Sequence, residues 1–455
     1  MCLFASRESD RWFAKWNKIK MNSCSFCTSL SLHYFCPNSN VMETNRRYFF
    51  NTTLHCNTYE HYTLSSLKGL TEKIPIKLYI ILFFGLTVLI SGCGGSGDGG
   101  NNRNWPLFRG DTGLSGFTET NIPEKPTLLW SYKSDSRTSS SPVVYDKTTY
   151  WCDKRGRVIG VDYDGNLRFG YNFSTAVEAT PMIHDSVLYI GRIDGIMSAL
   201  SLTKKDTLWT FETMGQIMAS PNIGVLNGRD VIVFGSYDNY LYCIDKQTGK
   251  ELNKFESGYY INGAAAFWQN YIISGGCDAL LKIIDVTTGI VVDSLFMDTY
   301  IPASPAIRDN HCYVGDHSGN VYDIVIEEGK IASWQKIVDV KDNDGTLVSV
   351  PAVSAKMLYV LSDDRNLYAI DRNDGSIRWK YLQKGSSGES SPLVCGNKVI
   401  SCSKSGIVSI LNASNGELLW EYDTGEQITA CPAVISGRFY ILTEKGTLFC
   451  FGAQG

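Results

Sequence analysis

The feature that most constrains this chain is a unit of about 40 residues that repeats in phase to the C-terminus. Each copy is anchored by a proline, which in most copies follows Ser or Thr. The anchors are Pro142, Pro181, Pro221, Pro305, Pro351, Pro392 and Pro432, with Ala265 in a degenerate copy. Successive anchors lie 39 to 46 residues apart. Such a period is typical of repeat architectures in which each unit packs against its neighbours.

One copy, Pro351–Trp379, predicts the structure of the unit. Short runs of β-branched and aromatic residues alternate with polar turns, and Gly375 ends a turn where a positive φ is needed. The predicted strands are Ala352–Val353, Met357–Leu361, Leu367–Ile370 and Ile377–Trp379. Each repeat is therefore predicted to form a sheet of four strands.

Two further markers repeat in step with the proline. One is an apolar strand such as Leu358–Leu361, and the other is an Asp-x-x-x-Gly turn such as Asp371 to Gly375. Three markers in phase are typical of a β-propeller. The expected fold class is all-β, an eight-bladed propeller of four-stranded blades.

The two ends of the repeat region predict how the propeller closes. Leu128–Tyr132 has the pattern of a fourth strand but precedes any first strand, and the last repeat ends after its third strand, Thr447–Phe451. We expect these two segments to pair, because closure removes the exposed sheet edges of an open array.

Aromatic residues recur in the fourth strands of six repeats. They are Trp130, Phe169, Trp209, Trp334, Trp379 and Trp420, while Asn253 and Asp293 depart from the pattern. One ring per repeat at a fixed position predicts packing between neighbouring blades, rather than a surface for stacking sugars or quinones.

The N-terminal part of the chain is unlike the repeats. Residues 1–77 contain five Cys and no repeat marker, and Cys24-x-x-Cys27 has no second pair at zinc spacing. We expect this segment to be a non-native or dispensable leader. Residues 78–93 then combine an apolar run, Leu78–Ile90, with Ile90-Ser91-Gly92-Cys93, which resembles the bacterial lipobox. Cys93 is the expected lipid attachment site.

The rest of the chain is expected to form a tether and one domain. Residues 94–104 are rich in Gly and Asn and predict a flexible tether, and residues 105–455 form the propeller. Residues 1–93 hold 10 of the 42 Lys and Arg residues and 5 of the 46 Asp and Glu residues, so the remainder has a formal charge of −9. An acidic domain disfavours nucleic-acid binding. We interpret most of the eight Cys residues after Cys93 as buried small apolar residues, and whether any pair is left open.

The repeat markers resemble those of the pyrroloquinoline-quinone-like (PQQ-like) propeller repeat family. The resemblance rests on Ala369-x-Asp371-x-x-x-Gly375-x-x-x-Trp379 and on the opening Trp105-Pro106-x-Phe108-Arg109-Gly110. That family includes quinoprotein dehydrogenases and BamB-type lipoproteins of the outer-membrane β-barrel assembly machine, and the lipobox with eight repeats resembles the second group. The resemblance implies a non-catalytic scaffold, anchored by lipid in the outer membrane, that binds a protein partner of the outer membrane or periplasm as a monomeric propeller.

The sequence gives little support to an enzyme. Quinoprotein dehydrogenases resemble one another in a bridged pair of adjacent cysteines and a calcium site, and this chain has no Cys-Cys pair. The polar run Asp342–Gly345 lacks the remaining spacing of a calcium loop, and the six His residues form no metal or triad pattern. We expect no enzyme activity, metal or cofactor. The alternative is a surface-exposed lipoprotein that binds a glycan or another ligand, and a PQQ-dependent dehydrogenase is least favoured.

One face of the propeller is the candidate docking surface. In the usual strand order the loops between second and third strands share a face with the loops between blades. The candidate basic residues in the former are Arg155, Arg192, His317 (if protonated), Arg365, Lys404 and Lys445, and the candidate aromatic residues in the latter are Tyr259, Tyr260 and Tyr300. This face is predicted to dock an acidic segment of a partner. The alternative is that these are ordinary turn residues paired with neighbours such as Asp153, Asp194 and Asp364.

Overall fold

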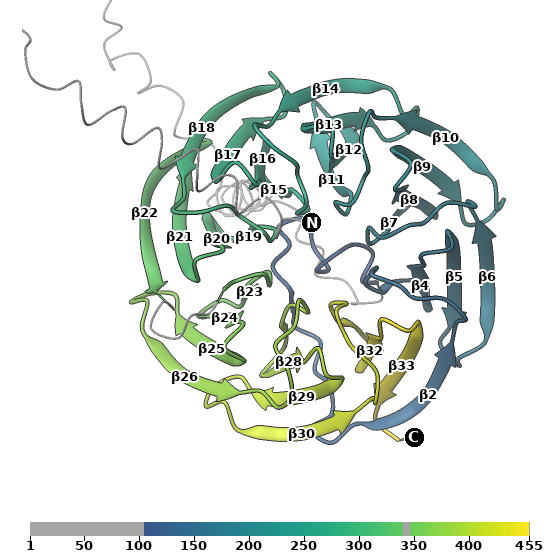
Figure 1. The fold of residues 1–455 in the computed structure, drawn as a ribbon, viewed down its shortest axis with the longest axis vertical. Helices are drawn as coiled ribbons and strands as arrows, with labels where there is room; N and C mark the ends of the chain where they lie inside the picture. Colours follow the sequence, from purple (N-terminus) through teal and green to yellow (C-terminus); the bar gives the residue numbers. More distant parts are fainter. Residues whose placement is uncertain (1–103, 340–345, 455) are drawn as a thin grey trace, which may run out of the picture. The chain divides into compact units, whose positions relative to one another are not determined.

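The computed structural model describes residues 104–339 and 346–454, and this part of the chain contains 33 strands and no helix. Eight sheets surround a common axis (Figure 1). The expected leader, the lipobox with Cys93 and residues 94–103 of the tether lie outside the described residues, as does Asp342–Gly345. The predicted all-β, eight-bladed propeller is confirmed.

The first four blades follow the chain in order. Blade 1 contains β3 (Val143–Tyr145), β4 (Thr148–Cys152), β5 (Arg157–Asp162) and β6 (Leu167–Asn172), and blade 2 contains β7 (Met182–His184), β8 (Val187–Gly191), β9 (Ile196–Ser201) and β10 (Thr207–Glu212). Blade 3 contains β11 (Asn222–Leu226), β12 (Arg229–Gly235), β13 (Tyr240–Asp245) and β14 (Glu251–Glu256), and blade 4 contains β15 (Ala266–Trp268), β16 (Tyr271–Ser274), β17 (Leu280–Asp285) and β18 (Ile290–Phe296).

Blades 5 to 8 complete the disc. Blade 5 contains β19 (Ala306–Arg308), β20 (His311–Gly315), β21 (Asn320–Glu327) and β22 (Lys330–Asp339), and blade 6 contains β23 (Ala352–Val353), β24 (Met357–Leu361), β25 (Asn366–Asp371) and β26 (Ile377–Leu382). Blade 7 contains β27 (Leu393–Cys395), β28 (Lys398–Cys402), β29 (Ile407–Asn412) and β30 (Leu418–Asp423), and β1 (Phe117–Thr118) adds a fifth strand to it. Blade 8 contains β31 (Ala433–Ile435), β32 (Arg438–Leu442) and β33 (Thr447–Gly452), with β2 (Thr127–Lys133) as its outer strand.

The ends of the repeat region close the disc as predicted. Strand β2 pairs antiparallel with β33, so that Leu128 lies opposite Phe451 and Trp130 opposite Cys450. The last blade therefore takes its fourth strand from the N-terminal side of the chain.

The residue before each anchor proline links neighbouring blades, a role that the repeat pattern did not reveal. The amide of Ser141 donates to the Thr180 hydroxyl at 2.9 Å, and the amide of Thr180 donates to the Ser220 hydroxyl at 3.2 Å. The amide of Cys431 donates back to the Ser141 hydroxyl at 2.9 Å, which joins blade 8 to blade 1. Because these groups are buried, each bond also satisfies a polar group that could not reach water.

The segment before β1 fills the centre of the disc (Figure 1). Its backbone is hydrogen-bonded to the innermost strands of six blades, through Val144, Ile183, Phe267, Ile307, Val353 and Val394. Arg109 is 1% exposed, and its guanidinium donates to the carbonyls of Pro351 and Pro392. Gly116 has φ +61, and a Cβ there would collide with Arg109. These contacts give a structural reason for the Trp-Pro-x-Phe-Arg-Gly opening.

Most of the fourth-strand rings pack between blades, as predicted. The indole Nε1 atoms of Trp130, Trp209 and Trp379 donate to turn carbonyls of the following blade, those of Tyr163, Lys246 and Ala413, at 2.9 to 3.1 Å. In seven of the eight blades the fourth strand contains one extra, unpaired residue immediately before the position of these rings.

The prediction for Trp334 is wrong. In blade 5 Gln335 lies opposite Asp323 at the position of the packing ring, while Trp334 lies opposite Ile324 and is 50% exposed. The blade 5 hairpin is longer than the others, and its irregularities lie at other positions along the pair. A shift of one residue turns a strand side chain to the opposite face of the sheet.

Candidate docking face

The structure confirms which loops share a face. The loops between blades begin beside the loops between second and third strands. The Phe173 amide donates to the Gly156 carbonyl, and the Thr213 amide donates to the Gly195 carbonyl. We name this side the loop face. The opposite side, the turn face, contains the turns between first and second and between third and fourth strands.

Local turn chemistry places the basic side chains on the loop face. The Asp153 carboxylate accepts the amides of Arg155 and Arg157 at 2.9 and 3.0 Å, which fixes the turn and leaves the Arg155 side chain 67% exposed. Arg365 has φ +72, a left-handed conformation. Most other blades have a glycine at the equivalent position, such as Gly406 in blade 7. A side chain in this region costs about 1 kcal/mol relative to Gly, so a long cation here is unusual.

The candidate cations form an arc rather than a full ring. Arg365, Lys404, Lys445, Arg155 and Arg192 belong to blades 6, 7, 8, 1 and 2, which are consecutive around the closed disc. Arg365, Lys404 and Lys445 make no ion pair within the described part of the chain, and Arg155 lies 3.8 Å from an oxygen of Asp135.

Two of the candidates differ from their neighbours in charge. Arg192 forms a two-pronged ion pair with Asp194 at 2.6 and 3.0 Å, and its guanidinium lies over the Phe173 ring, so its charge is largely compensated. His317 stacks on Tyr300 with ring centroids 4.4 Å apart. Burial lowers the pKa of His317 below its ordinary value, so near neutral pH it offers a ring surface rather than a cation.

The candidate tyrosines belong to a larger aromatic patch over blades 3 to 5. Tyr260 stacks on Tyr237 at 4.9 Å and meets Tyr259 edge-on at 6.1 Å. Tyr259 and Tyr260 are 55% and 45% exposed, and Met214 in the preceding inter-blade loop is 94% exposed. Tyr237 and Met214 were not among the residues selected from the sequence, although an aromatic residue and an exposed methionine in these loops could have indicated them.

Glu426 lies on the loop face, in the loop between blades 7 and 8. Burial opposes its ionisation, but hydrogen bonds from Lys133, Thr443 and Thr447 lower the pKa of Glu426 to about 2. This network ties β2 to the last blade on the loop face.

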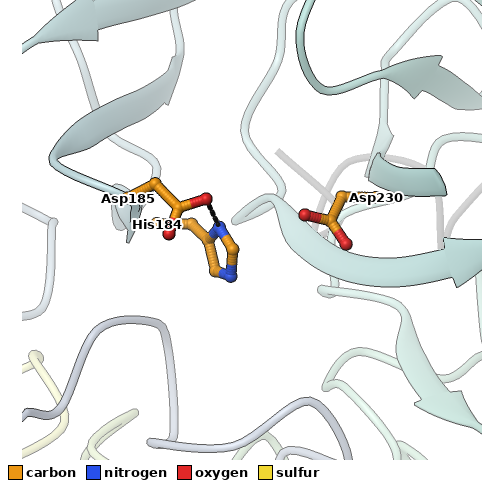
Figure 2. Close-up of side chains that lie close together, drawn as sticks. All are labelled: His184, Asp185 and Asp230. Atoms are coloured by element: carbon orange, nitrogen blue, oxygen red, sulfur yellow. Dashed lines mark ion pairs between the residues drawn. The ribbon is translucent and has the colours of Figure 1, made fainter.

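On the turn face, one group among the described residues has the spacing of a metal site (Figure 2). It consists of His184, Asp185 and Asp230, and joins blades 2 and 3. The Lys246 ammonium contacts all three, at 2.9, 2.7 and 2.5 Å. This cation lies where the ligand atoms converge and would repel a metal ion.

The eight cysteines after Cys93 are free, and seven of them are buried. Burial raises the pKa of Cys243 and of Cys450 to about 12, so these thiols are unreactive. The prediction that most are small apolar core residues is confirmed. Within residues 104–339 and 346–454, no helix has the length and apolar character needed to span a bilayer.

Known proteins are similar to this chain in sequence and in fold. The family model described as "Outer membrane protein assembly factor BamB" matches residues 123–260 and 278–455. The BamB protein of Legionella pneumophila (strain Paris) is 23% identical over 220 residues, which cover 48% of this chain and 47% of that protein. The chain thus aligns with about half the length of this curated relative.

Solved structures show the same fold in two functional groups. BamB from Moraxella catarrhalis superposes with a TM-score of 0.60 at 18% identity, covering 72% of this chain and 98% of that one. Quinohemoprotein alcohol dehydrogenase from Comamonas testosteroni superposes with a TM-score of 0.63 at 15% identity, covering 79% and 82%. At these identities the superpositions establish the fold alone.

Proposed function

The chain belongs to the outer membrane protein assembly factor BamB family, and from this membership we propose that it is a non-catalytic scaffold of the cell envelope, anchored by lipid at Cys93, that captures a protein partner with its loop face. The partner is a protein of the outer membrane or periplasm, and the propeller acts as a monomer. The names of the matching family and of its relatives support the assembly role, and the lipobox supports the anchor.

The observation on which the proposal depends is the division of the loop face into two surfaces. The basic arc (Arg365, Lys404, Lys445 and Arg155) lies beside the aromatic patch (Met214, Tyr237, Tyr259, Tyr260 and Tyr300 with His317). Exposed charges steer an acidic partner segment and raise its association rate, whereas exposed aromatic rings supply contact area once it has docked. A segment with acidic and apolar parts would engage both surfaces.

The axial segment supports a non-catalytic role. In the axial segment Arg109 donates to the carbonyls of Pro351 and Pro392, and Asp111 accepts from the amide and hydroxyl of Ser115. Arg109 and Ser115 are both buried. A buried arginine whose hydrogen bonds go to the backbone of two blades is a structural element rather than a reaction site.

Charge reversal on the loop face tests the proposal. Membranes from cells that produce Arg155→Glu/Arg365→Glu/Lys445→Glu are crosslinked, and the captured protein is identified and compared with the wild type. We expect slower capture and a weaker dependence on salt, with an unchanged melting temperature. The matched control reverses three exposed lysines of the turn face, Lys204, Lys250 and Lys330, and should capture normally.

Equal capture by both triple variants at low salt would contradict the proposed docking face. A Cys93→Ala variant tests the anchor separately, because loss of membrane association without loss of capture in solution would separate anchoring from docking.

A further inference from the structure

The hairpin of blade 5 is the largest departure from the repeat. Its strands β21 and β22 have eight and ten residues, whereas the third strands of the other blades have six. The Glu327–Lys330 turn of this hairpin lies on the turn face, and a hollow lies on each side of the hairpin. The hollows have volumes of about 630 and 600 Å³ and share Asn310. Both volumes fall in the range of roughly 300–1,000 Å³ that is usual for ligand sites.

The first hollow lies between blades 4 and 5. Its lining includes Trp268, Asn310, Glu327 and Glu328. The Trp268 ring is nearly parallel to Tyr271, whose hydroxyl donates to the Glu328 carbonyl at 3.1 Å. These contacts hold the indole as a platform beside two carboxylates that make no ion pair in the described structure.

The displaced Trp334 lines the second hollow, between blades 5 and 6. It pairs with Ile324, which shares its sheet face with Ile326, a residue of the first hollow. Half of the Trp334 side chain is exposed, so its indole is open to a ligand of the groove.

The second hollow lies at the place where other blades hold an indole. In blade 2 Trp209 packs 5.8 Å from Tyr189 and donates to the Lys246 carbonyl. The equivalent positions around blade 5 are Gln335, Tyr313 and Arg372, and all three line the second hollow.

Polar groups replace the missing indole. Asp323 is 2% exposed and binds the His311 Nδ1 atom at 2.7 Å, while Arg372 pairs with Asp309 at 3.3 Å. Asn373 and Ser333 add further donors and acceptors to a lining that also contains the Trp334 indole and the apolar residues Val325 and Ala355.

From these two hollows we propose that the foot of blade 5 is a binding groove for a neutral oligosaccharide. Sugar hydroxyls both donate and accept, which suits a lining of amides, carboxylates and a hydroxyl, and the apolar face of a sugar ring stacks on indole. Glu327 and Glu328 disfavour an anionic ligand. In the second hollow Arg372 pairs with Asp309 and His311 with Asp323, so its charged groups are already partnered and favour a neutral ligand. Two adjoining hollows fit a chain of sugar units better than a single ring.

Calorimetric titration of the full chain tests the groove. The protein is kept in a zwitterionic detergent without a sugar headgroup and is titrated with maltotriose, cellotriose, xylotriose, mannotriose and triacetylchitotriose. We expect at least one trisaccharide to bind. Trp268→Ala and Trp334→Ala should each weaken it by about three- to tenfold, the effect of losing one aromatic contact.

Two further variants separate the groove from a general loss of structure. Gln335→Trp supplies the indole that the other blades contain, so it should fill the second hollow and reduce binding without lowering the melting temperature. Tyr259→Ala removes an exposed ring from the loop face and should bind normally. Trilysine is the competing probe for a basic peptide.

Absence of binding by every trisaccharide at millimolar concentration overturns the proposal. Binding of trilysine without any trisaccharide also overturns it and assigns the groove to a cationic segment. Because partner capture by the loop face is measured separately, neither result depends on the proposed scaffold function.

Discussion

The Nη2 atom of Arg109 lies 2.9 Å from the carbonyl oxygen of Pro351, a residue 242 positions later in the chain. Its Nη1 atom donates to Pro392 in the next blade. Burial lowers the pKa of Arg109 from its ordinary value, and the Asp111 carboxylate counters that effect. The cation therefore joins the N-terminal segment to blades 6 and 7 at the centre of the disc.

Replacing Arg109 by Met should destabilise the propeller by about 3 kcal/mol or more, because two buried carbonyls would lose their donor and Asp111 would lose a nearby positive charge. Urea unfolding followed by fluorescence measures the change. Arg378→Met is the matched control, since Arg378 pairs with Asp371 and Asp374 at the surface and its loss should change the stability little. Equal losses in the two variants would show that the axial arginine has no special role.

Trp130→Ala and Trp334→Ala should differ widely in stability. Trp130 packs against Tyr440 and donates to the next blade, so its removal should cost about 3–5 kcal/mol. Trp334 is half exposed, and its loss should cost less than about 1 kcal/mol. Similar unfolding midpoints for the two variants would contradict the register of blade 5.

Removing the Lys246 ammonium should convert the neighbouring cluster into a metal site. In Lys246→Ala, His184, Asp185 and Asp230 keep their positions without the competing cation. We expect the variant to be less stable than the wild type and to regain stability with Zn²⁺, by the amount that ligand binding to the native state provides. Addition of a chelator should reverse the gain. Zn²⁺ should leave the melting temperature of the wild type unchanged, and a shift there would mean that the lysine does not exclude the ion.

Glu426 should make the stability sensitive to acid. Its pKa is lowered to about 2, so its contribution is complete above the ordinary carboxyl pKa of 4.5 and is lost as the pH falls toward 2. Lys133, its charged partner, is 53% exposed, so the contribution is discounted to about 1–2 kcal/mol. Glu426→Gln should flatten stability against pH in this window. If the pH profile of the variant ran parallel to that of the wild type, Glu426 would not contribute to the acid sensitivity.

Arg365→Gly should raise stability and lower partner capture. Glycine relieves the left-handed backbone at φ +72 and should stabilise the fold by about 0.5–1 kcal/mol, while the basic arc loses an exposed cation. Thermal melting and crosslinking in membranes measure the two effects on one variant. An increase in both would show that Arg365 does not contact the partner.

The sequence by itself determined the number of blades, most strand boundaries and the pairing of β2 with β33. Each repeat contains its own anchor and turn residues, and strands such as Met357–Leu361 match the structure to the residue. These features depend on local turn chemistry and on a pattern that recurs eight times, so the repeats of one sequence can be aligned with one another. The loop-face positions of the candidate residues follow from the same strand order.

Only the tertiary structure decided the features that break the repeat. Two irregularities in the β21–β22 pairing place Gln335, and not Trp334, at the position of the packing ring, and no composition pattern records which residue faces which. The contacts of Arg109 with Pro351, of Lys246 with His184 and of Tyr260 with Tyr237 join separate blades or the axial segment. Such contacts form once between unlike segments, and their energy depends on side-chain packing in three dimensions. For this reason neither period nor propensity could indicate them.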